Sequence, residues 1–192
     1  MFSGRNCKVE GCLRYALEED DVCLHHHPDN DNVLKDLLKT LSDTNRHVDI
    51  VLTDVHIKDV DFSNAYFVTC DFARCTFENV NFSNARVQAC FFDYSLFINC
   101  NLTNSDARHS VLAGSKLINC DFTNSLMLHS NMMGLDATNC NFSSSDLYRS
   151  NFSCSYLVDS LFVDCNMTGA DFRFSVRKNV SFKYSNYEEA LF

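Results

Sequence analysis

Three cysteines and a run of histidines near the start of the chain have the residue types and spacing of a metal site. Cys7, Cys12 and Cys23 precede the run 25–27, so the segment reads Cys-x4-Cys-x10-Cys-x2-His when His26 is the last ligand. Three thiolates and one imidazole form a complete tetrahedral set for zinc, and a site closed by four protein ligands is structural rather than catalytic. The sequence therefore predicts a zinc ion held by Cys7, Cys12, Cys23 and His26, with His25 or His27 as alternatives to His26.

The same residues also allow a simpler interpretation, in which three free thiols lie in a loose tail beside a chance run of histidines. We favour the metal because these three cysteines lie outside the repeat described below and beside the histidine cluster. So short a segment also has few other means of folding. The segment resembles small Cys3His zinc modules that have a glycine before the second cysteine, as Gly11 is here. The predicted zinc-binding segment covers residues 1–28.

The chain after the histidines has the pattern of one short amphipathic helix. In the stretch VLKDLLKTL, apolar residues at 33, 34, 37, 38 and 41 follow helical spacing. Asp31 or Asn32 is expected to be the N-cap after Pro28. Because the open end of a repeat array has to be covered, we expect this helix to form an N-terminal cap, followed by a linker, within residues 29–49. The alternative is a helix that binds a partner.

From residue 50 onward the sequence repeats every five residues without a slip. Every fifth residue from Leu52 to Phe192 is apolar or Tyr, and Arg177 is the single exception among 29 positions. The residue two before each of these is Ser, Cys, Ala or Val at 27 of the 29 positions. Neither the 3.6-residue period of a helix nor the 2-residue period of a flat sheet fits this pattern.

The chain also echoes itself every twenty residues. Asn99, Asn119 and Asn139 each precede a cysteine, and neighbouring columns with the same spacing are rich in Asn and Asp. Asn tolerates the positive φ of tight turns, and stacked Asn side chains can hydrogen-bond along the column. The family resemblance described next implies an explanation of this echo, namely coils of four pentapeptides, each stacked on the previous coil at a distance of about 4.8 Å.

These repeats resemble the pentapeptide-repeat family, whose motif is A(D/N)LXX. The resemblance covers residues 50–192, about three quarters of the chain. It implies an all-β solenoid, namely a right-handed quadrilateral parallel β-helix, here of about seven coils. The large residue of each pentapeptide then fills the interior, and the small residue lies beside it next to a corner.

Composition bounds the classes of function. The net charge of −9 argues against direct binding of nucleic acid, which usually requires a basic face. No apolar run approaches the ~18 residues that cross a membrane, and the first residues do not form a secretory signal, so a cytoplasmic protein with reduced thiols is expected. The sequence contains no phosphate-binding loop and no convergent acid–base set, so no enzymatic activity is expected.

Several repeat residues could carry chemistry, but their positions favour structural roles. The cysteines at the small interior positions, among them the column Cys100, Cys120 and Cys140, are expected to be core residues. Cys154 is at a corner, and His109 and His129 are expected to form a solvated column near Arg149. Arg177 falls where the core requires an apolar side chain, so we expect it to extend outward from a locally distorted coil.

Two surfaces are candidates for binding. Six outward positions that should be polar are instead apolar and cluster on two adjacent sides of the predicted solenoid: Phe91, Tyr94, Leu96, Ile98, Val111 and Ile118. At the other candidate surface, Tyr187, Leu191 and Phe192 are expected to leave an open apolar end, which predicts a homodimer through the C-terminal coil.

The favoured function is therefore a non-enzymatic protein-interaction or scaffold module with a structural zinc site and an unknown protein partner. The alternative comes from the family resemblance, because some pentapeptide-repeat proteins resemble DNA in size and charge and bind DNA gyrase. Residues 50–192 carry 15 acidic and 10 basic residues, net −5, which is weak for a mimic of DNA. The gyrase interpretation therefore ranks second.

Overall fold

The computed structural model describes residues 2–17, 20–43 and 46–192. Residues 1, 18–19 and 44–45, which fall within the predicted zinc segment and linker, lie outside the described residues. The chain forms two compact units, Met1–Asn45 and Arg46–Phe192, and each is described by itself. Among the described residues, no helix has the length and apolar character needed to span a membrane.

The first unit contains a small antiparallel hairpin followed by two helices. The strands β1 (Phe2–Asn6) and β2 (Tyr15–Leu17) pair with each other, and a short 3-10 helix η1 (Leu24–His26) precedes the α-helix α1 (Asn30–Asp43). The predicted helix is therefore confirmed, but Asp31 and Asn32 lie in its first turn and not at its N-cap. Asn32 instead donates to the carboxylate of Asp29 at 2.9 Å. The role of α1 as a cap for the solenoid stays a prediction.

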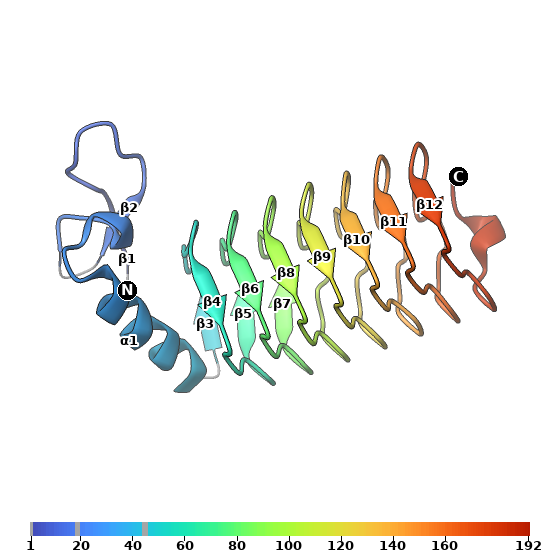
Figure 1. Cartoon of the computed structure of the whole chain (residues 1–192), viewed down its shortest axis with the longest axis horizontal. Coiled ribbons are helices and arrows are strands. Elements are labelled where there is room, and N and C mark those ends of the chain that lie inside the picture. Colours follow the sequence, from blue (N-terminus) through green and yellow to red (C-terminus); the bar gives the residue numbers. More distant parts are fainter. Residues whose placement is uncertain (1, 18–19, 44–45) are drawn as a thin grey trace. The chain divides into compact units, whose positions relative to one another are not determined.

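The second unit is a parallel β-solenoid of about seven coils (Figure 1). Strands of one side form a seven-stranded sheet in the order β12-β11-β10-β9-β8-β6-β4, and strands of another side form a three-stranded sheet in the order β3-β5-β7. Partners are always twenty residues apart, as in Ile57↔Phe77. The strands are β3 (Arg46–Val48), β4 (His56–Lys58), β5 (Tyr66–Val68), β6 (Thr76–Glu78), β7 (Arg86–Gln88), β8 (Leu96–Ile98), β9 (Lys116–Ile118), β10 (Asp136–Thr138), β11 (Tyr156–Val158) and β12 (Val176–Lys178), and a 3-10 helix η2 (Tyr187–Glu189) follows.

A left-handed corner every five residues makes each coil four-sided. Every fifth residue from Asp49 to Tyr184 has a positive φ, at 25 non-glycine positions and at Gly114, Gly134 and Gly169. Asn and Asp are frequent there because their short polar side chains tolerate this backbone conformation. The corners thus explain both periods of the sequence, since four five-residue sides return the chain to the same place after twenty residues.

The predicted large residues form the core. Each of them from Leu52 to Phe172 is buried. Phenylalanines one coil apart stack on each other, and Phe142 lies with its ring centroid 4.9 Å from that of Phe122 and 4.7 Å from that of Phe162. Such ring contacts add to the stabilisation that comes from removing apolar area from water.

The polar side chains at the small interior positions form hydrogen bonds with backbone groups. The Ser115 hydroxyl, for example, accepts a hydrogen bond from the Ser95 N–H at 3.0 Å and donates to the Phe92 carbonyl at 2.7 Å. Cysteine replaces serine in the same role, and the Cys100 thiol donates to the Phe77 carbonyl at 3.4 Å. Among the described residues, every buried side-chain nitrogen and oxygen has a hydrogen-bond partner. Ser and Cys are therefore tolerated in the interior because each reaches a backbone group.

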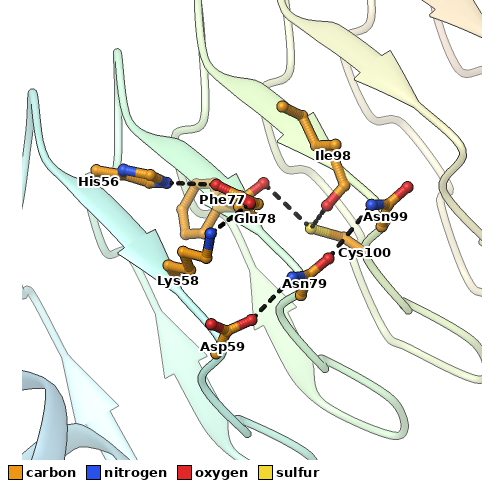
Figure 2. Close-up of polar contacts among 9 residues, drawn as sticks. All are labelled: His56, Lys58, Asp59, Phe77, Glu78, Asn79, Ile98, Asn99 and Cys100. Carbon is orange, nitrogen blue, oxygen red and sulfur yellow. Dashed lines mark hydrogen bonds and ion pairs between the residues drawn. The ribbon is translucent and has the colours of Figure 1, made fainter.

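One corner column forms the ladder that the twenty-residue echo predicts. The Asn79 amide donates to the Asp59 carboxylate at 2.8 Å, and the Asn99 amide donates to Asn79 at 3.3 Å (Figure 2). On the adjacent side, the Glu78 carboxylate accepts from Lys58 at 2.7 Å and lies 3.1 Å from a ring nitrogen of His56. These contacts link successive coils at the surface, while the backbone bonds link them throughout.

The two ends of the solenoid differ from its middle. The first coil begins at Arg46, which pairs with Tyr66 of the next coil. This is four residues before Ile50, where the five-residue period of the sequence begins. His47 occupies the large position there, buried and stacked on Phe67 with ring centroids 4.8 Å apart. At the other end, Arg177 is exposed, as expected, and its guanidinium lies 4.5 Å from the centroid of a phenylalanine ring. The last coil therefore accommodates a cation at a position that is buried elsewhere.

Candidate functional site

The four predicted metal ligands come from two short segments of the first unit. Cys7 follows β1, and Cys12 closes a turn in which its N–H donates to the Val9 carbonyl at 3.0 Å. Gly11 occupies this turn with φ +77°, a conformation that favours glycine. The other two ligands lie at the two ends of η1, with Cys23 as its N-cap and His26 as its last residue, and the His26 N–H donates to the Cys23 carbonyl at 3.0 Å. A turn and a short helix therefore each present two ligands.

The ligand atoms of Cys7, Cys12, Cys23 and His26 all lie within 4.8 Å of one another. Nδ1 of His26 is 3.3 Å from Sγ of Cys7 and 3.5 Å from Sγ of Cys23, and the Sγ atoms of Cys12 and Cys23 are 3.9 Å apart. A tetrahedral ion with bonds of about 2.3 Å to sulfur and about 2.1 Å to nitrogen separates its ligands by ~3.6–3.8 Å. The cluster therefore has the size and the donor atoms of a tetrahedral metal site.

The electrostatic environment differs between two of the thiols. Burial raises the pKa of the Cys7 thiol, but hydrogen bonds with His26 and with the backbone at Val9 and Cys23 outweigh burial and lower this pKa to about 6. Burial dominates at Cys23 and raises the pKa of its thiol. The thiolate is the form that binds a metal, so Cys7 is more ready to do so at neutral pH than Cys23.

The neighbouring His27 is directed to other groups. Nδ1 of His27 accepts a hydrogen bond from the Asp29 N–H at 3.1 Å, and its Nε2 lies 3.5 Å from a carboxylate oxygen of Asp20. The ring that joins the cysteine cluster is that of His26. Spacing favoured His26 with His25 and His27 as alternatives, and in the structure the ring that lies in the cysteine cluster is that of His26, the last residue of η1.

The predicted partner surface spans the corner that joins two sides of the solenoid. Tyr94 is at the corner and is 71% exposed, while Phe91 on the side before it is 46% exposed. The other four predicted residues, Leu96, Ile98, Val111 and Ile118, are half-buried. Pairing places Val111 next to Phe91 and Ile118 next to Ile98, one coil further on. The six residues therefore lie on two adjacent sides, as the four-sided arrangement predicts.

More exposed apolar side chains continue along the same edge, and sequence reasoning missed them. They are Met133, Tyr156, Phe174 and Val176, and Phe174 is 86% exposed. We name this edge the glycine edge and define it by its corner residues Arg74, Tyr94, Gly114, Gly134, Cys154 and Phe174, together with the outward residues beside them. The signal that could have indicated Phe174 is the one that indicated Tyr94, an apolar residue at an outward position that should be polar.

The remaining candidate residues have local explanations. His109 and His129 stack with ring centroids 5.3 Å apart, and His129 also contacts the Tyr148 ring. The thiols predicted to be in the core are buried, whereas Cys154 is exposed. At the C-terminal coil, the side chains of the predicted dimer surface are exposed, at 55% for Tyr187, 48% for Leu191 and 45% for Phe192.

Comparisons with known proteins agree with this fold. The family description "Pentapeptide repeats (8 copies)" matches residues 56–93, 92–124 and 115–153. Together these segments span 56–153, which is 98 of the 192 residues. A comparison with curated proteins finds no significant match.

One of the similar solved structures, QnrB1, gives the same result at the level of fold. QnrB1, a plasmid-mediated fluoroquinolone resistance protein, is 20% identical over 77% of this chain and 79% of its own, with a TM-score of 0.52. Rfr23 from the cyanobacterium Cyanothece 51142 is 11% identical over 83% of this chain and 99% of its own, with a TM-score of 0.43. HetL from the cyanobacterium Nostoc sp. strain PCC 7120 is 13% identical over 85% and 97%, with a TM-score of 0.28.

Proposed function

Because the chain belongs to the pentapeptide-repeat family, we propose that it acts without catalysis as a protein-interaction module whose glycine edge binds a protein partner. The observation that supports this proposal most is the concentration of exposed apolar side chains on that one edge, which include Tyr94 and Phe174. Exposed apolar side chains that gather on one surface of a protein commonly mark an interaction site.

The solenoid provides a regular support for such an edge. Its interior is filled by stacked side chains, and its corner backbone groups are already paired between coils, as in Gly114 N–H to the Met133 carbonyl at 2.9 Å. A partner at this edge would therefore contact side chains and not open backbone groups. Aromatic side chains suit this role because they bury a large area with few rotatable bonds.

A pair of matched substitutions tests the proposal. Tyr94→Asn removes the aromatic ring from the glycine edge and places the commonest corner residue there. Tyr184→Asn is the control, because Tyr184 is also an exposed aromatic residue at a corner with positive φ, but on a different edge. Affinity capture from the native host should recover a partner with the wild type and Tyr184→Asn and lose it with Tyr94→Asn. Equal recovery by all three proteins would contradict a role for this edge.

For the first unit, we propose that Cys7, Cys12, Cys23 and His26 hold one structural zinc ion. Three thiolates and an imidazole suit zinc, although copper(I) also favours soft sulfur ligands. With four protein ligands the ion has no open position for substrate, so its contribution would be to fold the hairpin and η1 around it. The arrangement of the ligand atoms within 4.8 Å supports this proposal.

Inhibition or protection of DNA gyrase remains the second candidate function. Five of the 15 acidic residues of residues 50–192 are in ion pairs with nearby bases, at Asp54, Glu78, Asp106, Asp136 and Asp171. A mimic of DNA gains from dense and unpaired negative charge, so this pairing argues against the idea. A supercoiling assay with purified gyrase tests it, and inhibition well below a micromolar would promote this function above the first.

The dimer through the C-terminal coil is a separate proposal. It uses Tyr187, Leu191 and Phe192, whose exposure is given above, and their apolar area would be buried twice in a symmetric pair. If light scattering shows a mass of twice 21.9 kDa that Phe192→Ser reduces to the monomer, the end-to-end dimer is supported.

A further inference from the structure

The proposed zinc cluster offers chemistry that holding an ion does not use. With four protein ligands, the ion has no open position at which a small molecule could bind. The thiolates themselves react with oxidants, and how readily each one reacts depends on its exposure to solvent. The placement and exposure of the three cysteines therefore decide what this cluster can do besides holding a metal.

One of the three thiols is open to solvent. Cys12 is half-buried in the turn that Gly11 makes, whereas Cys7 and Cys23 are buried, at 6% and 2% exposed. Leu13, the next residue of the turn, is 88% exposed, which agrees with an open turn. A dissolved oxidant therefore reaches the thiol of Cys12 before it reaches the other two.

The exposed thiol has a second thiol next to it. Sγ of Cys12 lies 3.9 Å from Sγ of Cys23, about 1.9 Å more than the length of a disulfide bond. Two sulfur ligands of one tetrahedral ion are separated by nearly the same distance, ~3.8 Å for bonds of about 2.3 Å. Sγ of Cys7 is placed differently, because it lies 3.3 Å from Nδ1 of His26. Cys12 and Cys23 therefore combine one reachable thiol with one adjacent thiol.

We infer that this cluster is a redox switch, in which a hydroperoxide oxidises Cys12 and Cys23 to a disulfide and the zinc ion is released. The inference rests on the proposed zinc site, since it names how that site is regulated. The same two sulfur atoms then have two uses, because the separation that suits two ligands of one ion also places them for a covalent bond.

The reaction balances with hydrogen peroxide as the oxidant. The Cys12 thiolate attacks one peroxide oxygen, the O–O bond breaks, and a sulfenic acid and hydroxide are formed. The Cys23 thiolate then attacks the sulfur of this sulfenic acid, the S–O bond breaks, and a disulfide and a second hydroxide are formed. The two sulfur atoms lose two electrons in total, the peroxide gains them, and two protons from solvent convert both hydroxides to water. A thiol reductant regenerates both cysteines by thiol–disulfide exchange.

Oxidation removes two of the four ligands at once. A disulfide sulfur lacks the charge of the thiolate, which is the form that binds a metal, so Cys7 and His26 remain as ligands. The described part of the first unit buries few apolar side chains besides the ligands, and a core of this size depends on such an ion. Cys7 directly follows β1, so release of the ion also removes its link between this strand and η1. The switch therefore couples an oxidant in solution to the folding of the hairpin.

The other cysteines do not compete for the oxidant as a pair. Eight of the eleven lie in the solenoid, and seven of these eight are buried. They replace serine in the interior, so their oxidation would require the coils to open. Cys154 is exposed, but the corners one coil away from it are Gly134 and Phe174, so it has no second thiol beside it in its column. Cys154 is therefore a suitable control.

Zinc release from the full chain tests the switch. Protein purified without a metal-affinity column is treated with hydrogen peroxide in the presence of a chromogenic zinc chelator. We expect the release of one zinc ion per chain, with little release when peroxide is omitted, and renewed binding after a thiol reductant and zinc are added. Cys154→Ser should release its zinc as the wild type does, because Cys154 is not part of the cluster.

A ligand that cannot form a disulfide separates zinc binding from oxidation. Cys12→His changes the donor set to two cysteines and two histidines, which is also a common set in structural zinc sites. This variant should bind one zinc ion but release it at least ~10-fold more slowly in peroxide, because its two remaining thiols are buried. If it releases zinc as fast as the wild type, the inference is wrong.

Peptide mapping of the wild type gives a second measurement that needs no variant. Basic residues separate the three cysteines, so trypsin places them in three different peptides, 6–8, 9–14 and 15–35. After peroxide treatment and alkylation of the remaining thiols, peptide 9–14 should be linked to peptide 15–35, and peptide 6–8 should be alkylated. Zinc release without this linkage contradicts the inference.

The outcomes distinguish the switch from the zinc site on which it rests. A wild-type chain with almost no zinc contradicts both. A chain that holds one zinc ion and keeps it in peroxide, with Cys12 and Cys23 still reduced, overturns the switch and leaves the structural zinc site in place.

Discussion

Replacing one cysteine of the proposed metal cluster should destabilise the first unit of the chain and leave the stability of the second unit unchanged. Cys12→Ser removes one of the four ligands of Cys7, Cys12, Cys23 and His26 and leaves an incomplete site. We expect the variant to lose its zinc, because a serine hydroxyl is a poor ligand for this ion compared with a thiolate. The first unit should unfold with it, while the solenoid remains folded.

The structure sets the scale of this effect. Apart from the ligands, the buried apolar side chains in the described part of the first unit are few, namely Ala16, Leu17, Leu24 and Leu41. A core of this size rarely stabilises so short a segment without a metal or a disulfide. Structural zinc sites in small peptides have apparent binding free energies of about 10–16 kcal/mol at neutral pH, and this free energy is coupled to folding. Loss of a direct ligand should therefore weaken zinc binding by more than ~100-fold, the upper range seen for outer-shell partners.

The assay combines metal content with local stability. Elemental analysis of wild-type protein, purified without a metal-affinity column, should give one zinc ion per chain. Hydrogen exchange should then show rapid exchange of the amides of residues 7–17 and 20–26 in Cys12→Ser, and unchanged protection in the solenoid. His27→Asn is the control, because His27 contacts Asp20 and Asp29 and is not part of the cluster. This control should keep both its zinc and its protection.

Two results would refute this reasoning. The first is a wild-type protein with almost no zinc and with the thiols of Cys7, Cys12 and Cys23 all freely titratable. The second is a Cys12→Ser variant that matches His27→Asn in zinc content and in amide protection. Either result would return the segment to the simpler interpretation of three unbound thiols.

Two further predictions concern the solenoid. Phe142→Ala removes a fully buried ring that is stacked on both faces, so it should lower the free energy of unfolding by about 3–5 kcal/mol. Phe91 is at an exposed position, so Phe91→Ala should lower the free energy of unfolding by about 1 kcal/mol or less. Urea titrations followed by circular dichroism measure both values. Equal losses would contradict the inward assignment of the large residues. Burial raises the pKa of the Asp106 carboxyl, but hydrogen bonds from Arg108 and its backbone outweigh burial and hold this pKa below its ordinary value. The Asp106 carboxylate therefore stabilises the fold at pH values above the ordinary carboxyl pKa of about 3.9, and this stabilisation is lost as the pH falls through the lower pKa that Asp106 has in the folded state. The difference in free energy of unfolding between wild type and Asp106→Asn should therefore shrink between about pH 7 and about pH 3.

The sequence by itself determined the fold of residues 50–192. A five-residue period that never slips leaves one way to bury every large residue, because a shift of one position would bring the polar corner residues inward. The same argument placed the cysteines at the small positions of the repeat in the core and the column from Asp59 to Asn139 at a corner, where hydrogen bonds link it. Periodic patterns are reliable because each repeat satisfies the same local rules as its neighbours.

The sequence did not determine where the solenoid starts, because the first coil has a polar residue where the other coils have an apolar one. His47 is polar, so the apolar count began after it, yet stacking on Phe67 buries its ring at the large position. Spacing also favoured His26 as the fourth ligand but left His25 and His27 as alternatives. The tertiary structure distinguishes them, since consecutive residues of a helical turn point in different directions and only His26 turns toward the three thiols.

The gathering of exposed apolar side chains along the glycine edge is the feature that only the tertiary structure decided. Tyr94 and Phe174 are eighty residues apart in the sequence, and the local pattern that marked the apolar residues around Tyr94 did not connect them to Phe174. The stacking of coils brings them onto one edge, with Gly114 and Gly134 between them. Local sequence rules specify which side chains point outward at each corner, but the surface on which they meet exists only after every coil is stacked in register, because it is built from contacts between coils and not within them.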